Sequence, residues 1–161
     1  MRKVSKTAKP AAPVRFLSLF VVGGGAAIAL GLASQSPARA DDQSAVEYRQ
    51  VVMKSLNAEA TALGMIMSGQ VPPDTLDLHT RSLANGAKAA SLAFEAKVPG
   101  GSAKPEVWNS EDFRNRMKEF SLKTEQMAQA GATGDLTAVG QMMVSAMPCK
   151  ACHDLYKEDD F

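Results

Sequence analysis

Apolar residues recur every three or four positions through most of the chain after residue 41, which is the spacing of amphipathic helices. Glycine and proline divide this part into four segments, at about residues 42–69, 74–97, 110–131 and 135–156. No stretch alternates apolar and polar residues for long enough to predict a β-strand. Four helices of this size, each about 30 Å long, joined by short connections, predict an all-α fold: an up-and-down antiparallel four-helix bundle.

Residues at the segment boundaries support this division. Ser110 and Asp135 stand where N-caps are expected, because their side-chain oxygens can accept hydrogen bonds from the free N–H groups of a first helical turn. Pro148 lies inside the fourth segment and lacks a backbone N–H. It therefore either kinks a continuous helix or marks the point where a new helix starts. Trp108 precedes the third segment, and we expect it to pack on the end of the bundle.

The first forty residues differ in composition from the rest. A basic start precedes an apolar stretch at 16–33 and the small-residue sequence Ala-Arg-Ala at 38–40. This order is typical of a secretory signal peptide. It predicts a cleaved signal peptide at 1–40 and one exported domain at 41–161, periplasmic and without stable membrane insertion after cleavage. The alternative is an uncleaved membrane anchor, for which about 18 apolar residues are near the lower limit.

Charge is distributed unevenly along the chain. Six of the 18 Lys and Arg lie in residues 1–40, which hold none of the 17 Asp and Glu. The predicted domain is therefore net acidic, which argues against nucleic-acid binding, since phosphate contacts require a basic surface. Two cysteines are also too few for a disulfide-rich scaffold.

The most specific motif is Cys149-Lys150-Ala151-Cys152-His153, which has the spacing of a c-type haem attachment site. Each thiol adds to one vinyl group of the porphyrin, so both sulfurs must reach one edge of the ring. On a helix, positions i, i+3 and i+4 share a face, so His153 can turn an imidazole nitrogen toward the iron. The motif predicts one covalently bound haem c with its iron.

Three other interpretations of the cysteine pair are weaker. A thiol-disulfide oxidoreductase, which would be an enzyme, places Cys-x-x-Cys near the start of a helix after a strand, whereas this pair lies near the C-terminus. A zinc site needs four ligands, and the only other histidine is His79. A structural disulfide would not explain the adjacent histidine. The export signal fits haem attachment, since haem c is matured outside the cytoplasmic membrane.

The chain resembles the class II c-type cytochromes, the cytochrome c-prime family, over residues 42–161. Besides the attachment motif near the C-terminus, the resemblance rests on three short sequences at 45–50, 104–108 and 154–156. It implies a left-handed four-helix bundle, usually periplasmic and often a homodimer. One position departs from the family pattern: Lys157 stands four residues after the motif histidine, where the family usually has arginine.

The resemblance also implies roles for individual residues at the haem. It assigns Cys149 and Cys152 to the vinyl groups and His153 to the iron as proximal ligand. Three further residues fall where the family contacts the haem propionates: Arg49, Gln50 and Ser102. A guanidinium suits a carboxylate that is partly buried, because its planar fork donates charge-assisted hydrogen bonds.

Met53 decides between two functions that the resemblance leaves open, because it falls over the distal, open face of the iron. If its sulfur binds the iron, His/Met ligation suits one-electron transfer with periplasmic redox partner proteins. This is the function that we expect. If Met53 only packs over the ring, the open face can take a diatomic gas, NO or CO. A thioether that merely fills the core is the third interpretation. None of these functions is enzymatic.

Overall fold

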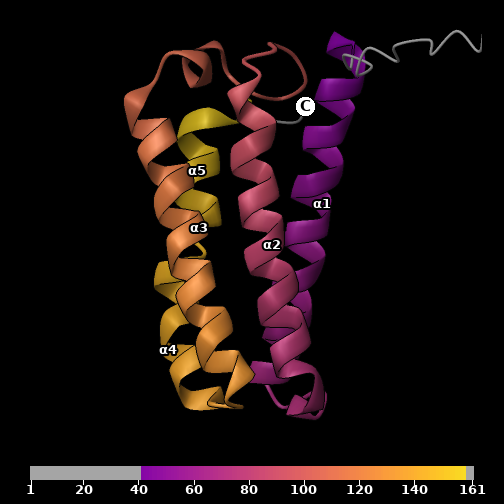
Figure 1. Ribbon diagram of the computed structural model, residues 1–161, viewed down its shortest axis with the longest axis vertical. Coiled ribbons are helices and arrows are strands. Elements are labelled where there is room, and N and C mark those ends of the chain that lie inside the picture. Colours follow the sequence, from indigo (N-terminus) through magenta and orange to yellow (C-terminus); the bar gives the residue numbers. More distant parts are fainter. Residues whose placement is uncertain (1–40, 159–161) are drawn as a thin grey trace, which may run out of the picture. The chain divides into compact units, whose positions relative to one another are not determined.

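The computed structural model describes residues 41–158, and the regular elements in this range are all helical, with no β-strand among them. They are, in order, α1 Asp42–Met67, η1 Pro73–Thr75, α2 Leu76–Glu95, η2 Pro105–Trp108, α3 Glu111–Ala132, α4 Leu136–Ala146 and α5 Cys149–Tyr156. Figure 1 shows the long helices lying side by side, with α4 and α5 together completing the bundle. The predicted all-α four-helix bundle is confirmed.

The fourth segment is broken rather than continuous, so a single helix over 135–156 is wrong. The break lies at Met147, whose φ of −122° and ψ of 66° leave the helical region, and at Pro148, which precedes α5. Pro148 cannot donate the hydrogen bond that would continue α4. Its carbonyl instead accepts the N–H of Cys152, at 3.0 Å, as the first turn of the new helix forms. The alternative in which a helix restarts at the motif is therefore confirmed.

The predicted N-caps are present. The Ser110 hydroxyl accepts the backbone N–H of Phe113 at 3.0 Å, and the Asp135 carboxylate accepts that of Ala138 at 2.9 Å. These bonds satisfy donors that a helix start leaves free. They fix where α3 and α4 begin, and therefore how the two helices are joined.

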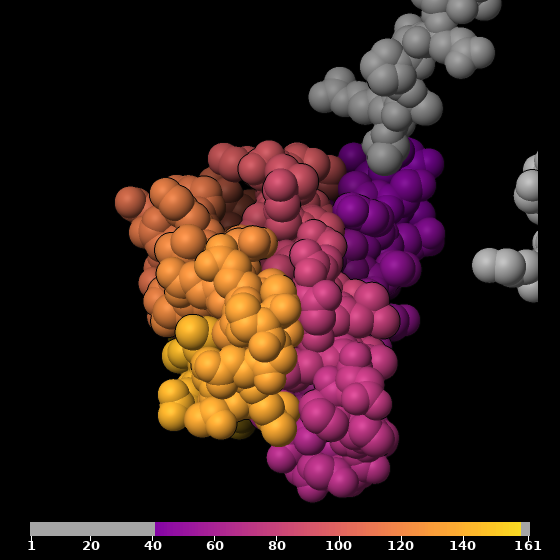
Figure 2. Space-filling view, turned by 60° about the horizontal axis from the view of Figure 1, so that its bottom comes forward, coloured from indigo at the N-terminus to yellow at the C-terminus, as the bar shows by residue number. Residues whose placement is uncertain are grey.

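The best-packed part of the core lies at one end of the bundle, where α1 turns into α2 and α3 into α4. Its fully buried side chains come from all four of these helices: Leu63, Leu76, Met127 and Val139. In Figure 2 the helices of this part pack closely against one another, with the gold and orange segments along the magenta α2. This end holds the bundle together, which leaves the other end free to form a cavity.

The predicted signal peptide, residues 1–40, lies outside the described residues, and its cleavage stays a prediction. Within 41–158, none of the helices combines the length and the apolar character that crossing a bilayer requires.

Candidate haem-binding site

A cavity of about 690 Å³ opens at the end of the bundle opposite the packed core. Its walls come from the first half of α1, the loop after α2, the start of α3 and α5. Six of the predicted site residues line it: Arg49, Gln50, Met53, Ser102, Cys152 and His153. The seventh, Cys149, lines an adjoining cavity of about 120 Å³ together with Met53, Cys152 and His153. The fold thus brings residues from three separate parts of the chain to one site of the size that cofactors occupy.

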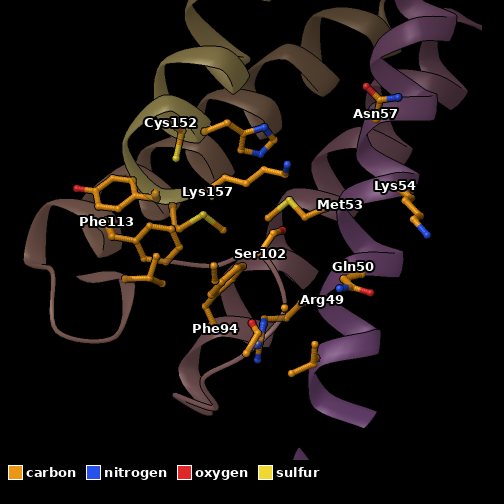
Figure 3. A pocket seen from close by; sticks show the side chains of 18 residues that line it. Arg49, Gln50, Met53, Lys54, Asn57, Phe94, Ser102, Phe113, Cys152 and Lys157 are labelled. Atoms are coloured by element: carbon orange, nitrogen blue, oxygen red, sulfur yellow. The ribbon is translucent and has the colours of Figure 1, made fainter. Parts of the chain in front are cut away.

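Helix α5 carries the attachment motif along one wall of this cavity. Cys149 and Cys152 are both free thiols. His153 is solvent-exposed and Cys152 is half-buried, and both line the cavity. Figure 3 shows Cys152 on α5 and Met53 reaching into the cavity from α1. The motif side chains therefore face the space that a porphyrin bound to them would fill.

The loop before α3 is tied to the end of α5 by backbone hydrogen bonds. The N–H of Lys104 donates to the carbonyl of Tyr156 at 3.0 Å, and the N–H of Glu158 donates to the carbonyl of Ser102 at 2.8 Å. Ala103 and Lys157 form an isolated antiparallel bridge between them. Ser102, a predicted propionate contact, is thereby held at the cavity beside the helix that carries His153.

The two thiols are poorly suited to disulfide exchange. Burial raises the pKa of the Cys152 thiol, and the positive charge of Arg116 lowers it by less. Partial burial of its sulfur also raises the pKa of the Cys149 thiol. The thiolate is the nucleophile, and reactive cysteines in oxidoreductases have lowered pKa values. Thiols that stay protonated at neutral pH fit a structural attachment role better than redox catalysis.

Arg49 brings a buried positive charge to the cavity. Its side chain is only 4% exposed. Nη2 donates to the carbonyl of Gly100 at 3.3 Å, whereas Nη1 is buried and has no hydrogen-bond partner within the described part of the chain. Burial lowers the pKa of Arg49, but a guanidinium stays protonated in proteins. A buried cation with an unsatisfied donor fits a cofactor with acidic groups, and the haem propionates are such groups.

Four aromatic rings form a row from Arg49 to α5, and sequence reasoning missed how they connect. Phe94 stacks on Trp108, Phe113 meets Phe94 edge-on with centroids 5.0 Å apart, and Tyr156 meets Phe113 at 5.1 Å. Trp108, which the sequence predicts only as packing on the bundle end, also contacts Arg49. His79 lies elsewhere: its Nδ1 is 2.8 Å from the Glu59 carboxylate on α1, and it does not line the cavity.

Comparison with known proteins places this site in a family. The sequence profile of the family described as Cytochrome C' matches residues 44–157. The chain belongs to the cytochrome c' family. The resemblance inferred from the motifs is therefore confirmed, and so is the expected cofactor, a covalently attached haem c with its iron.

Individual cytochromes c' match almost along their whole length. The protein from Alcaligenes xylosoxydans xylosoxydans is 28% identical over 126 residues, covering 74% of this chain and 97% of the relative. The protein from Pararhodospirillum photometricum is 27% identical over 128 residues, covering 74% and 100%. Among solved structures, a ferrous arginine-to-lysine variant of the cytochrome c' from Alcaligenes xylosoxidans with bound NO is 26% identical, with a TM-score of 0.69 over 76% of this chain and 99% of that one.

Proposed function

We propose that residues 41–161 form a periplasmic monohaem cytochrome that binds a diatomic gas, NO or CO, at the haem iron. The observation that carries this proposal is the second cavity, which Met53 lines together with Cys149, Cys152 and His153. It measures about 120 Å³, adjoins the main cavity and is lined mostly by apolar side chains such as Leu56, Leu83 and Phe120. Apolar space of this size is favourable for a small uncharged ligand. The NO-bound relative supports the same function.

In this proposal α5 fixes the cofactor and the other walls control access to it. Cys149 and Cys152 supply the two thioether bonds, and His153 supplies an imidazole nitrogen from the same helical face. The cofactor, when bound, supplies a one-electron couple and an open coordination position. Arg49, Gln50 and Ser102 line the same cavity and would hold the acidic groups of the cofactor. The apolar side chains that α1 and α3 contribute to the cavity, such as Met53 and Met117, would exclude water from it.

Electron transfer is the second candidate function, and the position of Met53 favours it. Met53 is half-buried and lines both cavities together with His153. Its thioether is of the type that completes His/Met ligation in electron-transfer cytochromes. In that case the iron is closed to gases, and the protein exchanges electrons with periplasmic redox partners.

Spectra of the purified haem-loaded protein separate the two candidates. Gas binding predicts a high-spin ferrous spectrum that shifts on addition of CO, with little difference between the wild type and Met53→Leu. Electron transfer predicts a low-spin spectrum unresponsive to CO, which Met53→Leu converts to a high-spin, CO-binding one. A low-spin wild type with that response to substitution would overturn the gas-binding proposal.

We further propose that the domain forms a homodimer. The outer surface of α1 exposes Tyr48 (53%) and Val51 (61%), two large apolar side chains one turn apart. Neighbouring apolar side chains on one helix surface leave water when a second copy of the helix packs against them, which favours association. Light scattering during size-exclusion chromatography should give twice the monomer mass for the wild type, and the monomer mass for Val51→Lys.

A further inference from the structure

The Arg49 guanidinium packs against two aromatic rings that also contact each other. Its central carbon is 5.0 Å from the centroid of the Trp108 ring and 5.4 Å from that of Phe94. The centroids of the two rings are 6.0 Å apart, and the ring planes are inclined by 29° to each other. Figure 3 shows Arg49 and Phe94 side by side at the end of the cavity. Cation–π contacts of this kind are strongest where the cation is shielded from water, and Arg49 is almost fully buried.

This aromatic pair, formed by Trp108 and Phe94, packs against Arg49 where that residue lines the cavity. Nη2 is engaged by the carbonyl of Gly100, a residue with a φ of +122° that few other residue types adopt. Nη1 is buried without a partner in the part of the chain that the structure describes. Leaving a charged donor unsatisfied costs stability, so an anionic acceptor beside Arg49 would stabilise this arrangement, and the cavity that Arg49 lines has room for one.

We propose that Trp108 is a positioning residue, which together with Phe94 holds the Arg49 guanidinium beside a haem propionate and so keeps that carboxylate ionised. This inference rests on the proposed haem site. It gives Trp108 a role beyond packing, because a side chain that only filled space would not orient the guanidinium.

Other side chains in the aromatic row hold the aromatic pair in place. Phe94 is held edge-on by Phe113, which is held in turn by Tyr156. The Tyr156 hydroxyl donates to the carboxylate of Asp112 on α3. Trp108 belongs to the short helix η2, whose end leads directly into the N-cap of α3. Both rings are therefore fixed by elements other than α1, on which Arg49 lies.

The test is the pH dependence of the reduction potential of the haem-loaded protein. The potential changes with pH across the pKa of a nearby propionate, and a close cation lowers that pKa. In Trp108→Leu the pH range over which the potential changes, here called the transition, should move up by about one unit. Trp108→Phe, which restores an aromatic face, should return it toward the wild-type position. Leu92→Ala, which removes an exposed apolar side chain two residues before Phe94, is the control and should leave it unchanged.

A double-mutant cycle assigns the effect to Arg49. Arg49→Lys should move the transition in the same direction, and adding Trp108→Leu should move it little further, because both changes remove the same interaction. Additive shifts would overturn the inference, and so would a haem-loaded Trp108→Leu protein with the wild-type transition. A wild-type chain that acquires no haem would overturn the proposed function, and the inference with it.

A second measurement does not depend on the Trp108 substitutions being tolerated. In the CO-loaded ferrous protein, which is diamagnetic, the side-chain N–H signal of Arg49 should be shifted upfield by the two rings. Arg49→Lys identifies the signal by its disappearance. A side-chain signal at the position of an exposed arginine would show that the guanidinium does not pack against the two rings, and would overturn the inference.

Discussion

The N–H of Lys104 donates to the carbonyl of Tyr156, joining the loop before α3 to the end of the helix that carries the haem motif. This hydrogen bond and the neighbouring one between Glu158 and Ser102 together close one side of the cavity. The position of the predicted propionate contact Ser102 thus depends on the chain at the end of α5.

Lys104→Pro tests this connection. Lys104 has a φ of −63°, which proline also adopts, so the substitution removes the N–H donor with little backbone strain. We expect the free energy of unfolding to fall by about 1 kcal/mol, the usual net value of one hydrogen bond. The amide of Glu158 should also exchange faster with deuterium. Lys104→Ala keeps the donor and is the control; an equal loss of stability in both variants would argue against the backbone bond.

Gly131 sets the closest approach of α2 and α3 in the packed core. A Cβ at this position would overlap the Thr80 hydroxyl oxygen and lie only 2.9 Å from the Thr80 Cβ. Gly131→Ala should therefore destabilise the fold by about 1–3 kcal/mol, as overpacking does, measured by denaturant unfolding. Adding Thr80→Ala should recover part of the loss. Gly64→Ala is the control, because nothing lies within 4 Å of the place its methyl group would take and alanine favours a helix.

Acid should weaken the contact between α3 and α5. The Tyr156 hydroxyl, and then Arg116, lower the pKa of Asp112 by hydrogen bonding to its carboxylate. A lowered folded-state pKa gives stability that is present above the unfolded value of about 3.9 and is lost as the pH falls through the folded value. Asp112→Asn should thus be less stable than the wild type at pH 6, with the difference shrinking below about pH 4. A difference that stays constant down to pH 2 would contradict this assignment.

Local sequence signals predicted most of the fold and the chemistry of α5. The caps Ser110 and Asp135, and the spacing of Cys149 to His153, act over a few residues, so the sequence reveals them directly. Pro148 left two outcomes open, because breaking or bending the helix depends on tertiary packing. The contact of Arg49 with the aromatic pair was not predictable, because Phe94 and Trp108 come next to Arg49 only after three separate elements have packed together.

Covalent haem attachment is tested most directly by the mass of the mature protein, produced in a bacterium with a working cytochrome c maturation system. We predict the mass of residues 41–161 plus one haem that survives denaturation, with the haem-bearing peptide containing both Cys149 and Cys152. Replacing both cysteines with alanine should abolish the addition. A mature wild-type chain with no added haem, folded and with free thiols, would contradict the haem-binding site and the function built on it.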